Sequence, residues 1–401
     1  MSPFQVYLDS SDFSDLSNPK RPEAYVDVER KLVAWLDAGV IEIRFSYLHV
    51  VEASPIKPED IESATGRFQK IVQLCGKKCF TSTISIIERE ISVPGEWQLP
   101  SYSDWLYRND GDWLPSINGL SIEDYSPQAM LRKEIHAAAS DRSTRRKMER
   151  QWFNQQGRLK PAAISRFRTT QAATIREIEE RFPLPPGAAK QIAECLAKES
   201  DSAKLESVLR ASLSDISYWP AWYKSHWDRV DPVSSFLRKA SRKINEQMDA
   251  AVQGLKQAYT NEVRGGLSAA ELDRLLKKRF KEAVAPMYGK IVKRLADEQG
   301  IEDATADREE AWNMRPGLAA ALAVQCQIAR RNMGLAGQPR QADEGDFGDV
   351  LHCVHLPFVD FFRADGFAAS VIAEAKLPFQ TKVVPKLAQL PVAIEERLRQ
   401  Q

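Results

Sequence analysis

The chain has 401 residues, of which 43% are hydrophobic and 28% are charged, and its formal net charge is +1. These values are ordinary for a soluble globular protein, and the length favours two domains over one. A net charge near zero creates no global field, so a polyanionic partner would have to be recognised by local clusters of basic residues. No apolar run is long enough to span a membrane and no signal-peptide pattern begins the chain, so we expect a cytoplasmic protein whose five cysteines are free thiols.

The first 85 residues have an alternating strand–helix pattern. A short apolar run ends at Asp9, which predicts a strand followed by a loop. A second strand is expected to lead into a short helix that is capped by Ser46 and carries Glu52. The expected elements are strands at 4–8 and 40–46 and helices at 22–38, after Ser46, and at 59–75. This order is typical of the beginning of an open parallel sheet.

The middle of the chain differs from the first 85 residues in composition and periodicity. Residues 91–135 are rich in proline, tryptophan, serine and aspartate and show little periodicity. From about residue 127 to residue 332 the pattern predicts mostly helices, with amphipathic stretches at 189–213, 234–261 and 267–299.

The α/β texture returns near the carboxyl end. We expect a well-buried helix at 317–331, a helical segment at 349–355, a strand at 358–362, a helix at 367–375 and a last strand at 381–384. The simplest organisation is one α/β domain, an open parallel sheet flanked by helices, built from residues 1–85 and 315–401. A mostly α-helical insertion domain would occupy residues 86–314.

Four carboxylates are expected to meet at one edge of this sheet. Asp9 ends the first strand, Glu52 follows the second, Asp349 precedes a later strand, and Asp365 follows that strand. Ligands collect at the carboxyl ends of strands in open parallel sheets. Such acids would repel one another unless a cation lay among them, and hard cations such as Mg²⁺ or Mn²⁺ take oxygen ligands. Asp360, inside the expected strand, is a further candidate ligand.

Each of these acids also has a purely structural interpretation. Asp9 and Asp365 could be turn residues, and Asp349 could cap a helix. Asp360 could be a hydrogen-bonded structural acid, and His352 could be a buried histidine that bonds a neighbouring backbone group.

The two ends of the chain resemble a PIN-like (PilT N-terminal) nuclease domain, of the bacterial type that carries a large insertion. The resemblance rests on Asp9-Ser10-Ser11 after the first strand, on Glu52 in a helix after the second, and on the block from Asp349-x-x-His352 to Asp365. It covers roughly residues 1–85 and 315–395. It implies a metal-dependent endonuclease, usually acting on RNA, with Asp9, Glu52, Asp349 and Asp365 as catalytic metal ligands. Ser11 and His352 would support them.

A basic region lies in the predicted insertion. Residues 141–170 contain nine lysines or arginines against two acids, with aromatic residues interleaved. Basic side chains follow a phosphate backbone and aromatic rings stack on unpaired bases, although a solvated helix face explains the pattern equally well. The candidate nucleic-acid-binding residues are Arg142, Arg145, Arg146, Lys147 and Arg150.

The function that these patterns favour is divalent-metal-dependent hydrolysis of phosphodiester bonds in nucleic acid, with RNA ahead of DNA. One alternative is a catalytically silent PIN-like binding or regulatory protein whose helical insertion docks a protein partner. A second alternative is a metal-dependent nucleotide phosphohydrolase. The sequence does not indicate the oligomeric state.

Overall fold

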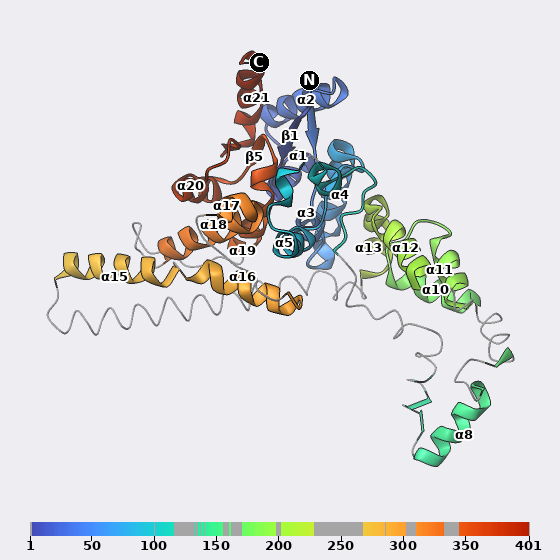
Figure 1. Ribbon diagram of the computed structural model, residues 1–401. Coiled ribbons are helices and arrows are strands. Elements are labelled where there is room, and N and C mark those ends of the chain that lie inside the picture. The colour runs from blue at the N-terminus through green and yellow to red at the C-terminus, as the bar shows by residue number, and fades with distance from the viewer. Residues whose placement is uncertain are drawn as a thin grey trace. The chain divides into compact units, whose positions relative to one another are not determined.

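The computed structural model (Figure 1) describes residues 2–99, 101–115, 141–154, 160–161, 171–197, 202–227, 268–284, 286–301, 310–332 and 345–400, and the single residues 132, 135, 136, 138 and 139. Its contacts divide the chain into two compact units. The first, which we call the sheet unit, combines Met1–Pro115 with Asp231–Gln401, and the second, the helical unit, is Ser116–Val230.

A small parallel sheet lies at the centre of the sheet unit. Its four strands have the order β2-β1-β5-β6, and every neighbouring pair is parallel. Strand β1 pairs with β5 through Val6 opposite Phe361 and Tyr7 opposite Phe362, so the two ends of the chain meet in the middle of the sheet. The strands are β1 (Phe4–Tyr7), β2 (Ile41–Ile43), β5 (Phe361–Arg363) and β6 (Lys382–Val384). The chain is mostly helical with one small parallel sheet, which agrees with the expected α/β class at this coarse level.

Helices from both ends of the chain surround the sheet. Helix α1 packs on α3 and α4, α18 packs on α19, η6 and α20, and α2 packs on α21 close to both chain termini (Figure 1). These elements are α1 (Ser10–Ser17), α2 (Glu23–Asp37), α3 (Tyr47–Ala53), η1 (Pro58–Asp60), α4 (Ile61–Cys75), α18 (Pro316–Asn332), α19 (Asp346–His352), the 3₁₀ segment η6 (Cys353–Phe358), α20 (Gly366–Ala375), η7 (Leu387–Gln389) and α21 (Leu390–Arg399).

Two expected local features differ from the structure. Helix α1 occupies the segment where a loop was expected, because its eight residues contain only two apolar side chains, Phe13 and Leu16, too few for a periodic pattern. Strand β5 begins at Phe361, three residues later than expected, because Pro357 lies in the preceding 3₁₀ segment.

The expected boundaries of the insertion also differ from the two units. Strands β3 and β4 form a two-stranded antiparallel sheet in the sheet unit, and α5 packs against α16 and α18. Residues 86–115 and the described helices after residue 231 therefore belong with the sheet. These elements are β3 (Cys79–Phe80), α5 (Thr83–Ser92), η2 (Glu96–Gln98), α6 (Tyr102–Leu106), β4 (Tyr107–Arg108), α15 (Ala269–Val284), α16 (Met287–Glu298) and α17 (Ala311–Met314).

The helical unit contains the described helices α8 (Arg142–Trp152), α10 (Gln171–Arg181), α11 (Ala188–Ala197), α12 (Ser202–Leu213), η4 (Ile216–Tyr218) and α13 (Trp219–Ser225). Its α10, α11 and α12 pack around a small core that includes Ile178, Ile192 and Ala193. The helix expected at 234–261 lies outside the described residues. None of the helices in the described ranges is long and apolar enough to cross a membrane.

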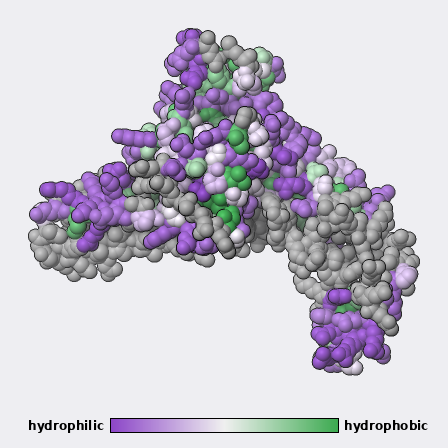
Figure 2. Space-filling view, viewed as in Figure 1, coloured by the Kyte–Doolittle hydropathy of each residue, from purple (hydrophilic) through white to green (hydrophobic). Residues whose placement is uncertain are grey.

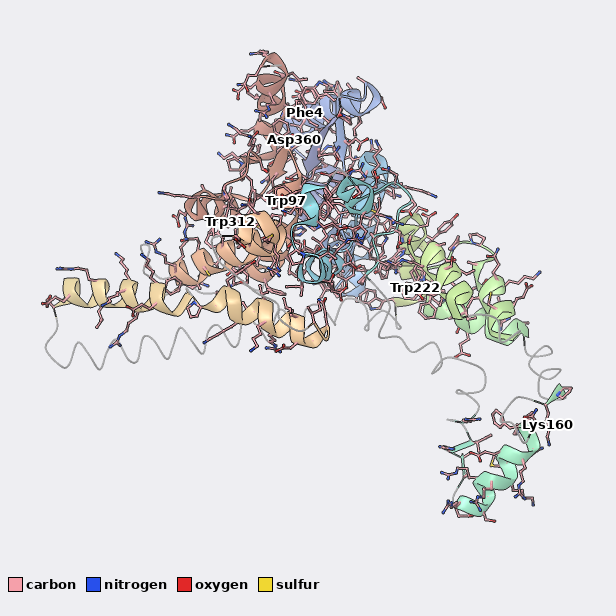
Figure 3. All side chains as sticks on the ribbon, in the orientation of Figure 1. Phe4, Trp97, Lys160, Trp222, Trp312 and Asp360 are labelled. Carbon is pink, nitrogen blue, oxygen red and sulfur yellow. The ribbon has the colours of Figure 1, made fainter. Side chains whose placement is uncertain are left out.

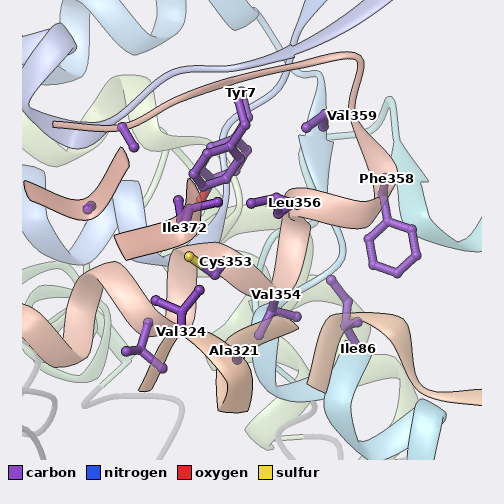
Figure 4. Close-up of a cluster of buried hydrophobic side chains, with 14 of the residues drawn as sticks. Tyr7, Ile86, Ala321, Val324, Cys353, Val354, Leu356, Phe358, Val359 and Ile372 are labelled. Carbon is purple, nitrogen blue, oxygen red and sulfur yellow. The ribbon is translucent and has the colours of Figure 1, made fainter. Parts of the chain in front are cut away.

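The main core of the sheet unit lies between strands β1 and β5 and helix α18. Tyr7 and Phe362 from the strands, Val324 from α18 and Val354 and Leu356 from η6 belong to one buried cluster (Figure 4). Helix α18 was expected to be apolar nearly all round, and nine of its seventeen residues are buried, which confirms that expectation. The core thus fixes the carboxyl ends of β1 and β5 against a rigid layer.

Candidate metal centre

The carboxyl ends of the two central strands form the candidate site. Asp9 lies two residues after the end of β1, and Asp365 lies two residues after the end of β5. Because β1 and β5 are adjacent and parallel, both acids lie at the same edge of the sheet. Asp9, Asp349 and Asp365 line one small cavity with a volume of about 10 Å³. That volume is about the least that holds one water molecule. We call this group, together with Glu52, the carboxylate edge.

Asp9 and Asp365 have similar local structures. Each caps the amino terminus of the helix that follows its strand: Asp9 accepts the Ser10 amide at 2.9 Å, and Asp365 accepts the Ala368 amide at 2.6 Å. The hydroxyl of Ser11 donates to the second oxygen of Asp9 at 2.5 Å, so Ser11 orients this carboxylate as expected of a supporting residue. Asp9 and Asp365 therefore cap helices, and each carboxylate still has lone pairs that could accept a further hydrogen bond or bind a cation.

Asp349 lies inside α19 rather than at its cap. Within the described part of the chain, its carboxylate receives no hydrogen bond. Burial and then the charge of Asp9 raise its pKa to about 8, with smaller contributions from Asp365 and Glu52, whereas the charge of His352 lowers it. The other three expected ligands are thus close enough to Asp349 to interact with it electrostatically.

Glu52 is already paired. Its Oε2 lies 3.1 Å from Nε2 of His352, and its other oxygen lies over Gly348, 2.6 Å from where a Cβ of that residue would stand. Burial opposes ionisation of Glu52, but the charge and hydrogen bond of His352, helped by Ser10, lower its pKa to about 2. Burial likewise disfavours a charged His352, yet Glu52 raises its pKa above the ordinary value. His352 therefore holds Glu52 as a carboxylate, although the Glu52 side chain remains 37% exposed.

A buried polar network supports His352. The Tyr7 hydroxyl lies 2.5 Å from Nδ1 of His352 and 2.8 Å from the Ser46 hydroxyl. Nδ1 of His49 accepts the Ser46 amide, so its Nε2 carries the proton and donates to the Leu8 carbonyl at 2.8 Å. Burial, followed by the charge of His352, lowers the pKa of His49 to about 3, so this ring is neutral. The network fixes the orientation of His352 from the core side.

No functional role was expected for Tyr7, His49 or Arg363 from the sequence. Tyr7 is fully buried in a central strand, and a buried tyrosine hydroxyl needs a polar partner, which was the available indication. Arg363 lines the cavity, and its Nε lies 3.0 Å from the buried Asp12 carboxylate. Burial raises the pKa of Asp12 to about 8 despite this arginine. A cation of the chain itself therefore lies beside the carboxylate edge.

Asp360 lies away from the other expected ligands and is removed from the candidate ligand set. It precedes β5, at the end of the strand opposite to Asp365, and its carboxylate accepts the Gln5 amide at 2.8 Å. In Figure 3 it lies near Phe4, the first residue of β1. At about 3.3 Å per residue, the strand separates Asp360 from the carboxylate edge by roughly 10 Å. Asp360 is the hydrogen-bonded structural acid, because the strand begins later than the sequence indicated.

The candidate nucleic-acid-binding residues lie on α8 of the helical unit. This helix contains Arg142, Arg145, Arg146, Lys147 and Arg150, and none of its residues is buried. Asp141 caps it by accepting the amides of Ser143 and Thr144. Next to it, Phe153 is buried, and Arg132 lies over its ring. Arg158, Arg166, Phe167 and Arg168, which belong to the same basic region, lie outside the described residues.

The carboxylate edge has the chemistry of a hard-cation site. Asp9, Asp349 and Asp365 offer oxygen ligands, and a cation would relieve the repulsion that acts on Asp349. Among the residues that the structure describes, however, no group of three or more His, Cys, Asp or Glu side chains is arranged to hold a metal ion directly. Mg²⁺ commonly binds through one or two carboxylates and keeps several waters, so the oxygen chemistry of these residues suits it.

Comparisons of the chain with family models, with curated proteins and with solved structures find no match.

Proposed function

We propose that the chain is a divalent-metal-dependent endonuclease with a PIN-like sheet unit, acting on RNA in preference to DNA. The observation that carries the proposal is Asp349, a half-buried side chain whose carboxylate receives no hydrogen bond in the described part of the chain. Desolvation raises its pKa, and the charges of Asp9, Asp365 and Glu52 add to that effect. Four acids from distant parts of the sequence interact at the carboxyl edge of a parallel sheet, which is where such folds bind ligands. Mg²⁺ or Mn²⁺ is the cofactor that this set of oxygen ligands suits.

The proposed roles differ among the acids. Asp9, Asp349 and Asp365 would hold the ion, since they line the cavity. His352 would position Glu52 beside them, since it is hydrogen-bonded to that carboxylate. A divalent ion bound there supplies an activated water and neutralises charge on a phosphate. The cavity of about 10 Å³ is far smaller than the few hundred Å³ that enclose a small-molecule ligand, which favours a polymer approaching from outside over a free nucleotide.

A silent PIN-like binding protein is the second candidate. It is favoured by the two cationic partners already present at the edge, His352 on Glu52 and Arg363 on Asp12, and by the lack of a preformed three-ligand group in the described ranges. In that case the chain would bind nucleic acid or a protein partner without cleaving anything.

The decisive experiment compares two identical substitutions near β5. Asp349→Asn removes the central carboxyl group of the carboxylate edge, and Asp360→Asn removes a carboxyl group at the opposite end of β5. Labelled RNA and DNA strands are incubated with each variant and with Mn²⁺, Mg²⁺ or a chelator. We expect the parent and Asp360→Asn to cut RNA with either metal, and Asp349→Asn to lose about a hundredfold or more of the rate, because charge stabilisation in an active site commonly contributes that much.

Equal cleavage by the parent and Asp349→Asn, or cleavage that persists in chelator, would contradict the proposal. Mn²⁺ binding that depends on Asp349 without any cleavage would favour the silent binding protein instead. Binding is measured separately by calorimetry, so the two outcomes are distinguishable.

A further inference from the structure

A second and much larger cavity lies in the sheet unit, away from the carboxylate edge. Its volume is about 420 Å³, which is within the range of small-molecule sites. It is lined by residues of α15, α16, α17 and α18 and by Ala375 at the end of α20. We call it the α15–α18 groove.

The lining of the groove is mainly apolar and contains three aromatic rings. Phe280 of α15, Tyr288 of α16 and Trp312 of α17 line it. Phe280 and Trp312 are only partly buried, so ring surface remains available. Trp312 contacts Phe379 edge-on at 5.6 Å. The Oε1 atom of Gln327, another lining residue, is buried and has no hydrogen-bond partner within the described part of the chain. An occupant with a flat ring and a hydrogen-bond donor would satisfy both features.

The charges of the groove have one sign. Lys277, Lys281 and Arg330 line it, and no acidic side chain is among the described lining residues. Both lysines are exposed, and the surface over α15 is strongly hydrophilic (Figure 2). Apolar ring faces with cations beside them fit a ligand that has an aromatic part and an anionic part.

We propose that the α15–α18 groove binds an unpaired nucleotide of a single-stranded RNA, with the base against the aromatic rings and the phosphate against Lys281 and Arg330. Single-strand binding sites combine these two features, because every base has a face that stacks and every nucleotide carries a phosphate. The inference rests on the proposed function in taking RNA as the strand.

Helix α20 connects the groove to the carboxylate edge. Asp365 caps the beginning of α20, and Ala375, its last residue, lines the groove. Ten helical residues span about 15 Å. A strand held in the groove is therefore close enough to bring a phosphate a few nucleotides further along to Asp365.

The test measures strand binding by the full chain in chelator, where cleavage is absent. The probe is a fluorescently labelled oligouridine of about 12 nucleotides, and binding is followed by anisotropy over a range of salt concentrations. The double variant Lys281→Ala/Arg330→Ala removes two groove cations. The matched control, Lys278→Ala/Lys293→Ala, removes two exposed cations of α15 and α16 that do not line the groove.

We expect the groove variant to bind at least about tenfold more weakly at low salt. Its log–log salt slope should be smaller by about 1.4, because each neutralised phosphate of a single strand contributes about 0.7. The control should stay within about twofold of the parent. Phe280→Leu keeps an apolar side chain but removes a ring, and it should weaken binding about fivefold or more without changing the salt slope.

Equal losses in the two double variants would overturn the inference, because only general charge would then matter. Displacement of the probe by laurate but not by uridine monophosphate would also overturn it, in favour of a fatty-acid site. The outcome is separable from the proposed function. Asp349→Asn should lose cleavage but bind the probe as the parent does, which tests the proposed nuclease. The groove double variant should lose probe binding, which tests the groove.

Discussion

At the residue scale, Gly348 shows how closely the carboxylate edge packs against its own backbone. A Cβ at this position would stand 2.6 Å from Oε1 of Glu52, nearer than real Cβ atoms approach another atom. The obstructing atom is the end of a flexible side chain, so the glutamate can turn away without disturbing the helix. Gly348 therefore determines where Glu52 points rather than whether α19 folds.

We predict that Gly348→Ala displaces Glu52 from His352 while leaving the fold intact. The apparent melting temperature should stay the same or rise slightly, because alanine is favoured over glycine in a helix by about 1 kcal/mol. Mn²⁺ affinity, measured by calorimetry, should fall about tenfold. Gly366→Ala is the control, since nothing lies within 4 Å of a Cβ there. Unchanged Mn²⁺ affinity in Gly348→Ala would show that the position of Glu52 is irrelevant to the ion.

The three residues for which no role was expected from the sequence share one property. Tyr7, His49 and Arg363 lie in or beside apolar segments, so their spacing indicates burial but gives no partner. The position of Asp9 and Asp365 at one edge of the sheet was predictable, because each follows a short apolar run that reads as a strand. Asp360 was misplaced because a one-dimensional pattern does not fix where a strand begins to within a few residues.

At the scale of one element, α18 depends on a buried carboxylate at its beginning. Glu90 of α5 is 3% exposed and accepts the amides of Gly317 and Leu318, both at 2.8 Å. These amides begin α18 and have no partner within that helix. A Cβ on Gly317 would stand 2.8 Å from the Val354 carbonyl, so α18 also needs glycine there to approach η6. The long apolar stripe of α18 was predictable from sequence, but its cap lies 227 residues away.

We predict that Glu90→Gln destabilises the chain by about 1–3 kcal/mol near pH 5, because an amide accepts through only one oxygen and leaves a buried N–H unpaired. Burial raises the pKa of Glu90 to about 7, partly offset by the two amides and Arg315. A raised carboxyl pKa contributes stability that is complete below the unfolded pKa and is lost as pH rises through about 7. The free energy of unfolding of the parent should therefore fall between pH 5 and 8. In Glu90→Gln this pH-dependent contribution is absent, so its free energy of unfolding should not fall for this reason.

The measurement is the free energy of unfolding by urea at pH 5 and at pH 8. Between pH 5 and pH 8 the stability of the parent relative to Glu90→Gln should fall by roughly 3 kcal/mol, which is the value of a shift of this size, so the gap should close or reverse at the higher pH. Glu88→Gln, at an exposed neighbouring position, serves as the control. A gap of equal size at both pH values would mean that Glu90 is ionised throughout.

At the scale of the whole molecule, all four acids of the carboxylate edge and all four strands of the parallel sheet lie in the sheet unit. The basic helix α8 lies in the helical unit. The sequence predicted a sheet built from both ends of the chain, because the α/β texture stops and later resumes. It did not predict that α15, α16 and α17 belong with the sheet, because amphipathic helices do not indicate which neighbour covers their apolar face.

We predict that replacing Ser116–Val230 with a flexible glycine–serine linker leaves the sheet unit folded. Its helices and strands contact one another without this segment, so circular dichroism should show a cooperative melt and Mn²⁺ should still bind. A second variant, truncated before residue 382, loses β6 and α21 and should not fold, because it removes the buried Val384, Leu390 and Ile394 and leaves one side of β5 without a neighbouring strand. Aggregation of the linker variant would show that the two units are interdependent.

The pairing of β1 with β5 has a consequence for synthesis on the ribosome. Val6 cannot pair with Phe361 until that residue has been synthesised, and Phe361 is 355 residues later in the chain. At about 5–20 residues per second, the first strand emerges roughly 20–70 s before its neighbour exists. During that interval Asp9 and Glu52 are present but Asp349 and Asp365 are not. A nascent chain thus cannot assemble the carboxylate edge until most of the last sixth of the sequence has been made, and the proposed nuclease would be inactive until then.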